Sequence, residues 1–267
     1  MMIDRVQFVD EHPRLLPCAL TVVVPVYRNA DTLAELTQRL HAALDSNGID
    51  HRILMVDDNS PDGSWQILDK LCYNDNRLAA VKLSANLGQQ HALFIGLSLS
   101  TDSAWVAVID ADLQDPPEIL PAMYEKGLST DGPVFAERFG KYERWDRMLS
   151  SVVFKSLSGL ISGLPHRCGT FFIAPRHLVA CVLDFPVVTP HLPIMMRIAT
   201  DRFATVPFVR LCRPRGKSAY NFYRRCCSAY DCLRCAIACR LKKKIKLPVT
   251  NRLTSKISMT CGYGWAT

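Results

Sequence analysis

The stretch VIDADLQDPPE, residues 108–118, runs from an apolar segment into three aspartates and two prolines. The overlapping run WVAVI is typical of a strand that is buried on both faces of a sheet. Side chains two residues apart on a strand point to the same side, so Asp110 and Asp112 can converge. Proline suits the first turn of a helix, where its missing N–H loses no hydrogen bond. The stretch therefore predicts a strand that ends at an acidic site and is followed at once by a helix.

The same alternation of strand-like and helix-like segments recurs along most of the chain. Strands are expected over residues 20–27, 52–58, 78–84, 104–110 and 133–137, and helices over 31–48, 64–74, 86–100, 116–127 and near 142–163. The first of these helices has an apolar face and a capping box formed by Thr32 and Glu35. Strands that alternate with helices predict an α/β fold, with a Rossmann-like, largely parallel central sheet covered by helices on both faces.

Polar clusters follow three of the expected strands, at residues 27–29, 57–60 and 110–115. In an open parallel sheet, ligands bind outside the carboxyl ends of the strands, so these clusters define the expected site. The convergent carboxylates of Asp110 and Asp112 suit a hard cation such as Mg²⁺ or Mn²⁺ and leave positions open for a substrate diphosphate. Acids at strand ends also serve as solvated turn and cap residues, and from this pair alone that interpretation stays open.

Composition indicates a globular protein with an uneven distribution of charge. Of the 267 residues, 49% are hydrophobic and 21% are charged, which suits one main buried core. No run reaches the ~18 apolar residues of a membrane-spanning helix, and the N-terminal residues lack the apolar core of a signal peptide, so we expect the chain to stay in the cytoplasm. Residues 1–212 hold 19 Lys and Arg against 24 Asp and Glu, whereas residues 213–267 hold 13 against Asp231 alone. The body and the tail are therefore expected to have different tasks.

Four motifs, in order and spacing, resemble those of family 2 glycosyltransferases with the GT-A fold. They are VVPVYRNADTL, VDDNSPDGS, NLGQQHALFIGL and VIDADLQDPPE. Within that family they look most like the polyprenyl-phosphate hexosyltransferases, the dolichol-phosphate mannose synthase group. The resemblance covers about residues 20–225 and implies a GT-A type central sheet that binds a nucleotide sugar.

The resemblance implies a donor pocket and a metal site. The residues that would bind the donor nucleotide are Pro25, Tyr27, Asp57 and Asn86. Asp57 would accept a hydrogen bond from the base. Asp110 and Asp112 would match the DxD motif of the family, which binds Mg²⁺ or Mn²⁺, with Gln114 beside it.

The resemblance also implies basic residues at the donor phosphates. Arg138 would lie at the phosphate site, and Arg147 is a weaker candidate of the same kind. The segment RPRGKSAYNF resembles the closing loop R-x-x-G-x-S-x-Y of the family, which would put Arg213 on the diphosphate and Lys217 near it. The residues expected to take part in catalysis are Asp110, Asp112, Arg138 and Arg213.

Two positions depart from the pattern of the family. Many relatives read G-D-F where this chain has Thr170 between Gly169 and Phe171, so an acid that could serve as a base is missing. Many relatives have Lys where this chain has Ala219, which leaves Lys217 as a substitute. A hydroxyl acceptor needs a general base, whereas a phosphate monoester is already anionic at neutral pH. The Thr170 substitution therefore favours a lipid-phosphate acceptor.

These observations predict an inverting, metal-dependent glycosyltransferase that moves a sugar from a UDP- or GDP-linked donor to a polyprenyl-phosphate lipid carrier. One alternative is transfer to a growing cell-surface glycan such as lipopolysaccharide or O-antigen, with a glycolipid acceptor. Another is a non-catalytic nucleotide-sugar-binding module. A haloacid-dehalogenase type phosphohydrolase would also place DxD after an apolar strand, but Gln114 stands where that motif has Thr or Val, and the motif follows the fourth strand rather than the first.

The tail suggests contact with a membrane. The predicted division is a catalytic domain over 1–212, a closing loop and basic amphipathic helix over 213–246, and an irregular tail over 247–267. The helix and the following LKKKIK are expected to attach peripherally to an anionic surface on the cytoplasmic side of the membrane. The five cysteines between 226 and 239 are interpreted as free thiols rather than as a zinc site. No recognisable nucleic-acid-binding motif accompanies the basic residues.

Overall fold

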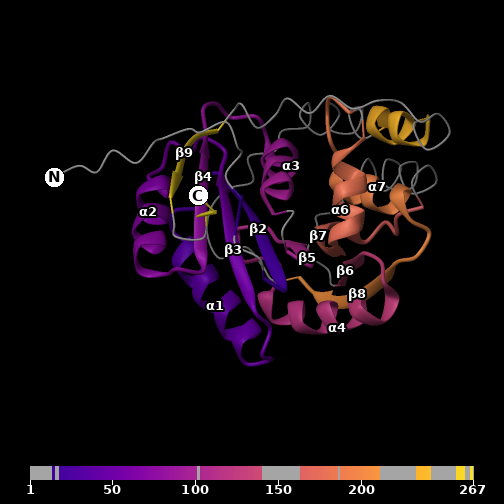
Figure 1. The fold of residues 1–267 in the computed structure, drawn as a ribbon, viewed down its shortest axis with the longest axis horizontal. Helices are drawn as coiled ribbons and strands as arrows, with labels where there is room; N and C mark the ends of the chain where they lie inside the picture. Colours follow the sequence, from indigo (N-terminus) through magenta and orange to yellow (C-terminus); the bar gives the residue numbers. More distant parts are fainter. Residues whose placement is uncertain are drawn as a thin grey trace.

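The computed structural model describes residues 14–15, 18–100, 103–139, 163–185, 187–210, 233–241, 257–261 and 265–266. Its main feature is an eight-stranded sheet that runs through the middle of the molecule with helices on either side (Figure 1). The strands are β1 (Arg14–Leu15), β2 (Leu20–Val26), β3 (His51–Asp57), β4 (Leu78–Leu83), β5 (Trp105–Val108), β6 (Val134–Phe139), β7 (Cys168–Pro175), β8 (Ala204–Val209), β9 (Ile257–Cys261) and β10 (Trp265–Ala266). The helices are α1 (Leu33–Asp45), α2 (Ser64–Asn74), α3 (Gln89–Leu99), η1 (Pro117–Ile119), α4 (Leu120–Thr130), α6 (Arg176–Leu183), α7 (Leu192–Ala199) and a helix over 233–241.

The strand order in the sheet is β8-β6-β7-β5-β2-β3-β4-β9. β5, β2, β3 and β4 are parallel neighbours at its centre, as the alternating sequence predicts. The predicted α/β class, with a largely parallel sheet and helices on both faces, is confirmed. β7 enters antiparallel between β5 and β6, and β8 then pairs parallel with β6. β7 is not among the predicted strands, and the helix predicted near 142–163 lies outside the described residues.

Each face of the sheet has its own hydrophobic core. In β2, Val22 and Val24 belong to the core that α1, α2 and α4 cover, whereas Val23 belongs to the core that α3, α6 and α7 cover. This alternation follows from the two-residue period of a strand. Every residue of β2 is buried, and burial of one aliphatic side chain contributes about 1.5–3 kcal/mol. β2 therefore links the two cores.

Helix α3 approaches the sheet closely because Gly96 has no side chain. A Cβ at this position would overlap the Val23 side chain and lie 3.1 Å from Cγ2 of Val56. Both valines are fully buried, so neither can move away without opening the core. This close packing fixes the position of α3, whose first residue, Gln89, lies at the carboxyl ends of the strands.

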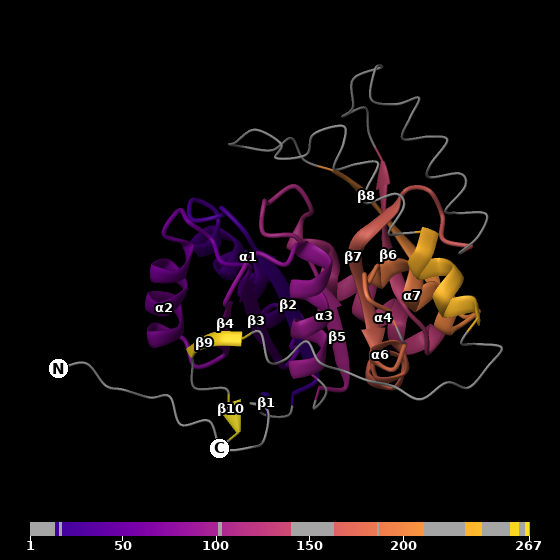
Figure 2. The ribbon, with the colours of Figure 1, turned by 90° about the horizontal axis from the view of Figure 1, so that it is seen from above.

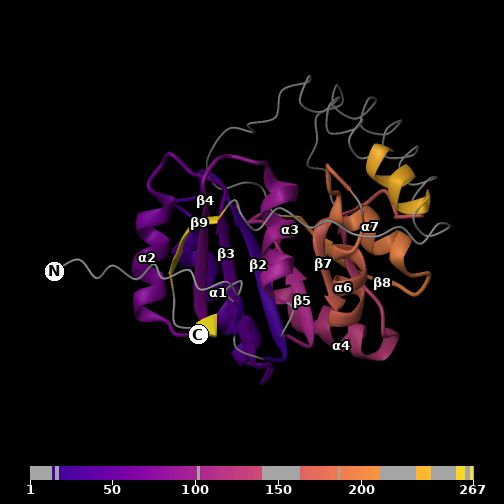
Figure 3. The same ribbon diagram turned by 45° about the horizontal axis from the view of Figure 1, so that its top comes forward.

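The C-terminal residues return to the sheet. β9 pairs antiparallel with β4 at the edge of the sheet (Figures 1 and 3). β10 pairs with β1 in a separate two-stranded sheet (Figure 2). The sequence predicts an irregular tail over 247–267, whereas the segment ISMTC forms a strand there. Without β9, the outer edge of β4 would present unpaired backbone N–H and C=O groups. β9 forms hydrogen bonds with these groups.

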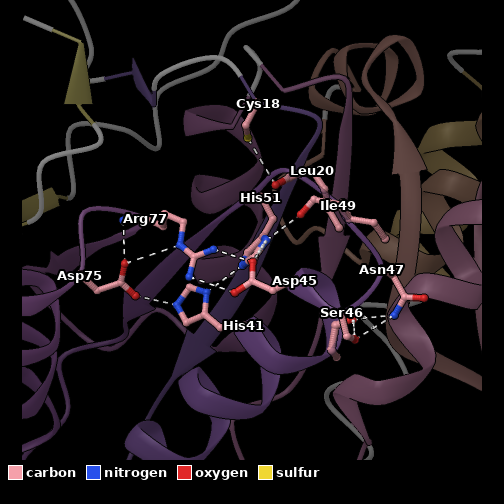
Figure 4. Close-up of polar contacts among 11 residues, drawn as sticks. Cys18, Leu20, His41, Asp45, Ser46, Asn47, Ile49, His51, Asp75 and Arg77 are labelled. Atoms are coloured by element: carbon pink, nitrogen blue, oxygen red, sulfur yellow. Dashed lines mark hydrogen bonds and ion pairs between the residues drawn. The ribbon is translucent and has the colours of Figure 1, made fainter.

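A polar cluster lies at the amino end of β3, opposite the strand ends that carry the predicted site (Figure 4). His41 Nδ1 lies 2.8 Å from His51 Nε2, and His41 Nε2 lies 2.6 Å from Asp75 Oδ2. Arg77 donates to the two carboxylate oxygens of Asp45 at 2.7 and 3.2 Å. Burial lowers the pKa of His51 and so favours its neutral form. The cluster joins α1, β3 and the connection between α2 and β4 at this end of the sheet.

Substitution of Gly96 tests the packing of α3 on the sheet. We expect Gly96→Ala to lower the free energy of unfolding by about 1–3 kcal/mol, because the added methyl group overpacks the core at Val23. Urea denaturation followed by circular dichroism measures the change. Ser98→Ala, two residues along the same helix, is the control and should change stability little. An unchanged denaturation midpoint for Gly96→Ala would contradict the close contact.

Candidate active site

The loop after β5 contains residues 110–115, which we call the acidic loop. It carries Asp110, whose carboxylate is contacted from two sides. Gln89 Nε2, at the start of α3, donates to Asp110 Oδ1 at 2.5 Å. Thr170 Oγ1, on β7, donates to the same carboxylate and lies 3.3 and 3.4 Å from its two oxygens. Burial, and after it the negative charge of Asp115, raises the pKa of Asp110 to about 6. Negative charge is therefore crowded at the carboxyl end of β5, where a cation would relieve the repulsion.

A left-handed residue shapes the rest of this loop. Leu113 has a φ of +59°, which costs a non-glycine residue about 1–2 kcal/mol, and burial of its side chain offsets the cost. The turn lets Gln114 N donate to Asp112 Oδ1 at 3.1 Å. Thr32 Oγ1 donates to Ala111 O at 2.6 Å. The Thr32 side chain makes no cap hydrogen bond, so the predicted capping box is absent and the hydroxyl fastens the acidic loop to α1 instead.

A second acidic cluster lies at the end of β3. Asp57 is the last residue of that strand and is fully buried, and its Oδ1 accepts a hydrogen bond from Ser60 N at 3.0 Å. Among the described residues, no donor reaches Asp57 Oδ2. Burial raises the pKa of Asp57. A buried carboxylate oxygen that lacks a donor is suited to accept a hydrogen bond from an N–H group of a planar base.

Asp58, the next residue, anchors the loop between β4 and α3. Its two oxygens accept hydrogen bonds from Leu87 N at 2.6 Å and Gly88 N at 2.8 Å. Burial raises the pKa of Asp58, and these two backbone donors partly oppose that rise. The anchored loop carries Asn86, which is exposed, and leads into α3 at Gln89. The end of β3 is thereby connected to the element that contacts Asp110.

Asp115, which is fully buried, joins the acidic loop to two arginines. Its Oδ2 accepts a hydrogen bond from Arg138 Nη2 at 2.8 Å, and its Oδ1 lies 3.3 Å from Arg210 Nε. Arg138 lies on β6 and Arg210 follows β8, its parallel neighbour. The positive charges of both arginines also act on Asp110. Acidic and basic groups therefore meet at the carboxyl ends of the parallel strands.

Gly169, on β7, lies against the guanidinium group of Arg138. A Cβ at Gly169 would lie 3.0 Å from both Cζ and Nη1 of Arg138. Such contacts are tighter than ordinary van der Waals packing, so a larger residue would push the arginine away. Arg138 is thus confined between Gly169 and the carboxylate of Asp115.

The structure places six of the predicted donor and metal residues at the carboxyl end of the sheet or in the loops that follow it. They are Tyr27, Asp57, Asn86, Asp110, Asp112 and Gln114. Pro25 is buried within β2, opposite Val56. Arg147, Arg213 and Lys217 lie outside the described residues, together with the rest of the predicted closing loop. The roles assigned to all these residues stay predictions.

Five residues that make contacts in the site are not among the residues predicted to bind the donor or the metal or to take part in catalysis. They are Asp58, Gln89, Asp115, Thr170 and Arg210. Gln89 lies in the motif NLGQQHALFIGL and Asp58 in the motif VDDNSPDGS, but the residues that they contact lie on other segments of the chain. Arg210 stands outside every motif. Its contact with Asp115 depends on β8 pairing with β6, and no local sequence pattern indicates that pairing.

The acidic loop fits a divalent cation that binds together with a diphosphate. Within the described parts of the chain, no group of three or more His, Cys, Asp or Glu side chains could hold a metal by itself. Asp110 and Asp112 offer oxygen ligands of the kind that Mg²⁺ and Mn²⁺ prefer. Two carboxylates leave most coordination positions to other oxygens, which phosphates and water supply. The residues therefore fit a cation shared with a substrate rather than a closed structural metal site.

The helix over 233–241 packs one side against the core that contains α3, α6 and α7. The residues on its buried side are Cys235, Ala236 and Cys239. Ile237 and Leu241 are about half exposed, and Arg240 is exposed. Cys235 and Cys239 are free thiols, as are Cys18, Cys72, Cys168 and Cys181. Among the helices of the described residues, none combines the length and the hydropathy needed to cross a membrane.

The family model of Glycosyl transferase family 2 matches residues 21–181, which is more than half of the chain. The matched segment begins in β2 and ends in α6. It therefore includes both acidic strand ends, Asp115, Arg138 and Thr170.

Similar solved structures share the fold. Glucosyl-3-phosphoglycerate synthase from Mycobacterium tuberculosis, in complex with Mn²⁺, UDP and glucosyl-3-phosphoglycerate, is 16% identical, with a TM-score of 0.58 over 87% of this chain and 82% of that one. Mannosyl-3-phosphoglycerate synthase from Rubrobacter xylanophilus is 18% identical, with a TM-score of 0.56 over 88% and 77%. S. aureus TarS 1-349 in complex with UDP-GlcNAc is 18% identical, with a TM-score of 0.56 over 89% and 69%. At these identities the likeness shows the fold alone, which is of the GT-A type.

Removal of the Asp115 charge tests how strongly the acidic loop depends on it. We expect Asp115→Asn to lower the free energy of unfolding by about 3 kcal/mol, because it leaves two largely buried guanidinium groups without their carboxylate. Guanidinium chloride denaturation measures the change. Asp201→Asn is the matched control, since the Asp201 side chain is 90% exposed in its ion pair with Arg197, and it should change stability little. Equal effects of the two substitutions would contradict a structural role for Asp115.

Proposed function

The chain belongs to glycosyl transferase family 2, and we propose that it is an inverting, metal-dependent glycosyltransferase that transfers a sugar from a UDP- or GDP-linked donor to a polyprenyl phosphate. The observation that carries this proposal is Asp115, which ties the acidic loop to Arg138 and Arg210. Carboxylates that can share a cation and guanidinium groups that can bind phosphate oxygens then lie at one edge of the sheet. That combination suits a nucleoside diphosphate with its metal.

The donor base is assigned to the end of β3. Asp57 Oδ2 is buried, and no described residue donates to it, so a ligand N–H would fill an unmet hydrogen bond. Tyr27 lies at the neighbouring strand end and is 37% exposed, which leaves part of its ring for contact with a base. Pro25 and Asn86 complete the proposed pocket. Two of the similar structures were solved with UDP or UDP-GlcNAc bound, which supports a nucleotide as part of the donor.

The chemistry follows from where charge develops during transfer. The leaving diphosphate gains negative charge as the bond to the sugar breaks, and a bound cation would stabilise that charge as a Lewis acid. Asp110 and Asp112 would hold the cation, with Gln114 beside them. Arg138 would donate to the phosphate oxygens from its place between Asp115 and Gly169. By resemblance, Arg213 and Lys217 would close over the diphosphate as part of the predicted closing loop.

The proposed acceptor is a phosphate rather than a neutral hydroxyl. Thr170 lies beside Asp110, and its hydroxyl donates a hydrogen bond to that carboxylate. Thr170 is therefore not placed to take a proton from an acceptor. Asp110, as a proposed metal ligand, would be committed to the cation. An acceptor that is already anionic needs no base. This argument favours a polyprenyl phosphate over a growing glycan with free hydroxyl groups.

Attachment at the cytoplasmic surface of a membrane is part of the proposal. The helix over 233–241 keeps Ile237, Leu241 and Arg240 on its exposed side while its other side packs on the body. The sequence LKKKIK follows directly, and each Lys or Arg near an anionic leaflet contributes about 1 kcal/mol. Such a helix would hold the active site close to a lipid acceptor.

Donor turnover tests the proposed activity. We expect release of nucleoside diphosphate from UDP- or GDP-sugars only with Mg²⁺ or Mn²⁺, because the diphosphate and the acidic loop otherwise bring like charges together. Asp112→Ala should reduce turnover by roughly 100-fold. Asp50→Ala, an exposed acid at the amino end of β3, is the control and should stay fully active. Full activity in excess EDTA, or in Asp112→Ala, would end the metal proposal.

Nucleotide binding tests the assignment of Asp57. We expect Asp57→Ala to weaken UDP or GDP binding by about tenfold or more, because a hydrogen bond to a charged acceptor is worth about 1.5–3 kcal/mol. Isothermal titration calorimetry measures the affinity, and circular dichroism checks that the fold is kept. Ser64→Ala, at the start of α2, provides a nearby buried control. If Asp57→Ala binds nucleotide as tightly as the unsubstituted chain, the base binds elsewhere.

Acceptor choice tests the role of the lipid phosphate. We expect transfer of radiolabelled sugar to a polyprenyl phosphate in anionic vesicles and none to neutral oligosaccharides, because Thr170 stands where a base for a hydroxyl group would be expected. 3-Phosphoglycerate is included because similar structures are named for its glycosylation. Transfer only to neutral glycans, or only to 3-phosphoglycerate, would overturn the proposed acceptor while keeping the glycosyltransferase activity.

A further inference from the structure

Asp110 is contacted by two uncharged donors that come from different parts of the fold. Gln89 is the first residue of α3, and Thr170 lies on β7. β5 and β7 pair antiparallel with Val108 opposite Phe172, and this register continued by two residues puts Thr170 across from Asp110. Each contact therefore follows from the packing of a whole element and not from the loop that carries Asp110.

We propose that Gln89 and Thr170 are positioning residues that hold the Asp110 carboxylate in the orientation in which it binds the cation of the donor. This inference rests on the proposed function. Gln89 occupies a lone pair of Oδ1, and the Thr170 hydroxyl spans both oxygens. A carboxylate has about four lone-pair sites, so acceptor capacity remains for a metal. Because both donors are neutral, they orient the carboxylate without cancelling its charge.

The elements that carry the two donors hold them in place. Threonine is β-branched and has few rotamers in a strand, so β7 fixes the direction of the Thr170 hydroxyl. The backbone of Gln89 is held by α3, which packs closely on β2 and β3 at Gly96, and by the hydrogen bonds from Leu87 and Gly88 to Asp58 just before it. Partners that orient a metal ligand typically change metal affinity by 10–100-fold when they are removed.

The residue next to Gln89 offers a matched control. Gln90 Oε1 accepts a hydrogen bond from Leu192 N at 3.0 Å, so its amide faces α7 and not the acidic loop. Gln89→Met and Gln90→Met make the same chemical change at adjacent positions of one helix. Only the first of them removes a donor from Asp110.

The experiment measures Mn²⁺ binding directly, by the loss of the free-ion signal in electron paramagnetic resonance, with purified protein and either UDP or GDP. We expect Thr170→Val and Gln89→Met each to weaken Mn²⁺ binding by about tenfold. Thr170→Ser keeps the hydroxyl and should stay within about threefold of the unsubstituted protein. Gln90→Met should bind Mn²⁺ normally. Nucleotide affinity without metal should be the same in all four variants, because both donors contact Asp110, which is not part of the proposed base pocket.

The outcomes separate this inference from the function on which it rests. If Thr170→Val and Gln89→Met bind Mn²⁺ as tightly as the unsubstituted protein while Asp112→Ala does not, the positioning inference is wrong and the proposed function stands. If the unsubstituted protein binds no Mn²⁺ with either nucleotide, both fail. Should Gln89→Met not fold, the Thr170→Val and Thr170→Ser pair decides, since equal affinities in those two variants contradict a role for the hydroxyl.

Discussion

The parallel hydrogen-bond register of β2 with β3 and β5 is the constraint on which the rest of the structure depends. It sets Leu20 opposite both His51 and Trp105, so the three strands start level and their carboxyl ends lie along one edge. Parallel neighbours require a crossover between them, and the helices of these crossovers cover both faces of the sheet. With both faces buried, the strand ends are the part of the sheet left for polar chemistry. The positions of Asp57 and Asp110, at the end of β3 and just after β5, follow from that arrangement.

Burial disfavours the charged form of the aspartates at the carboxyl ends of the strands, and the surrounding groups compensate some of these aspartates more than others. The pKa values of Asp57, Asp58 and Asp110 are all raised, in each case mainly by burial. Asp58 is compensated by two backbone N–H groups and Asp115 by guanidinium groups. Asp57 keeps an oxygen that no described donor reaches, and the two donors that the described residues offer to Asp110 are both neutral. Of these four acids, Asp57 and Asp110 have the least compensation. Asp57 is assigned to the base and Asp110, together with Asp112, to the cation, which is the pattern expected of a site completed by its ligand.

Local patterns were enough to predict the central elements, and contacts between distant segments were not predictable in the same way. The alternation of apolar runs located β2 to β5 and α1 to α4, because each run reflects burial of its own residues. The predicted capping box at Thr32 is wrong, because the Thr32 hydroxyl donates to Ala111 O, which lies 79 residues away in the chain. Thr170 was recognised only as the absence of an acid, and its contact with Asp110 requires the antiparallel insertion of β7. No sequence pattern predicts the contact of Arg210, because its partner Asp115 lies on a distant segment of the chain, after β5.

The pairing of β9 with β4 also has a consequence for the order in which the protein is made. Ala80 pairs with Cys261, so the ribosome must synthesise nearly every other element before the strand that covers this edge exists. During that interval β4 presents an open row of backbone donors and acceptors, to which a neighbouring nascent chain could add. Lys82 lies on this strand, and a charge on an edge strand discourages such pairing. During synthesis, the strand that completes the sheet therefore emerges after the parallel strands that carry the site.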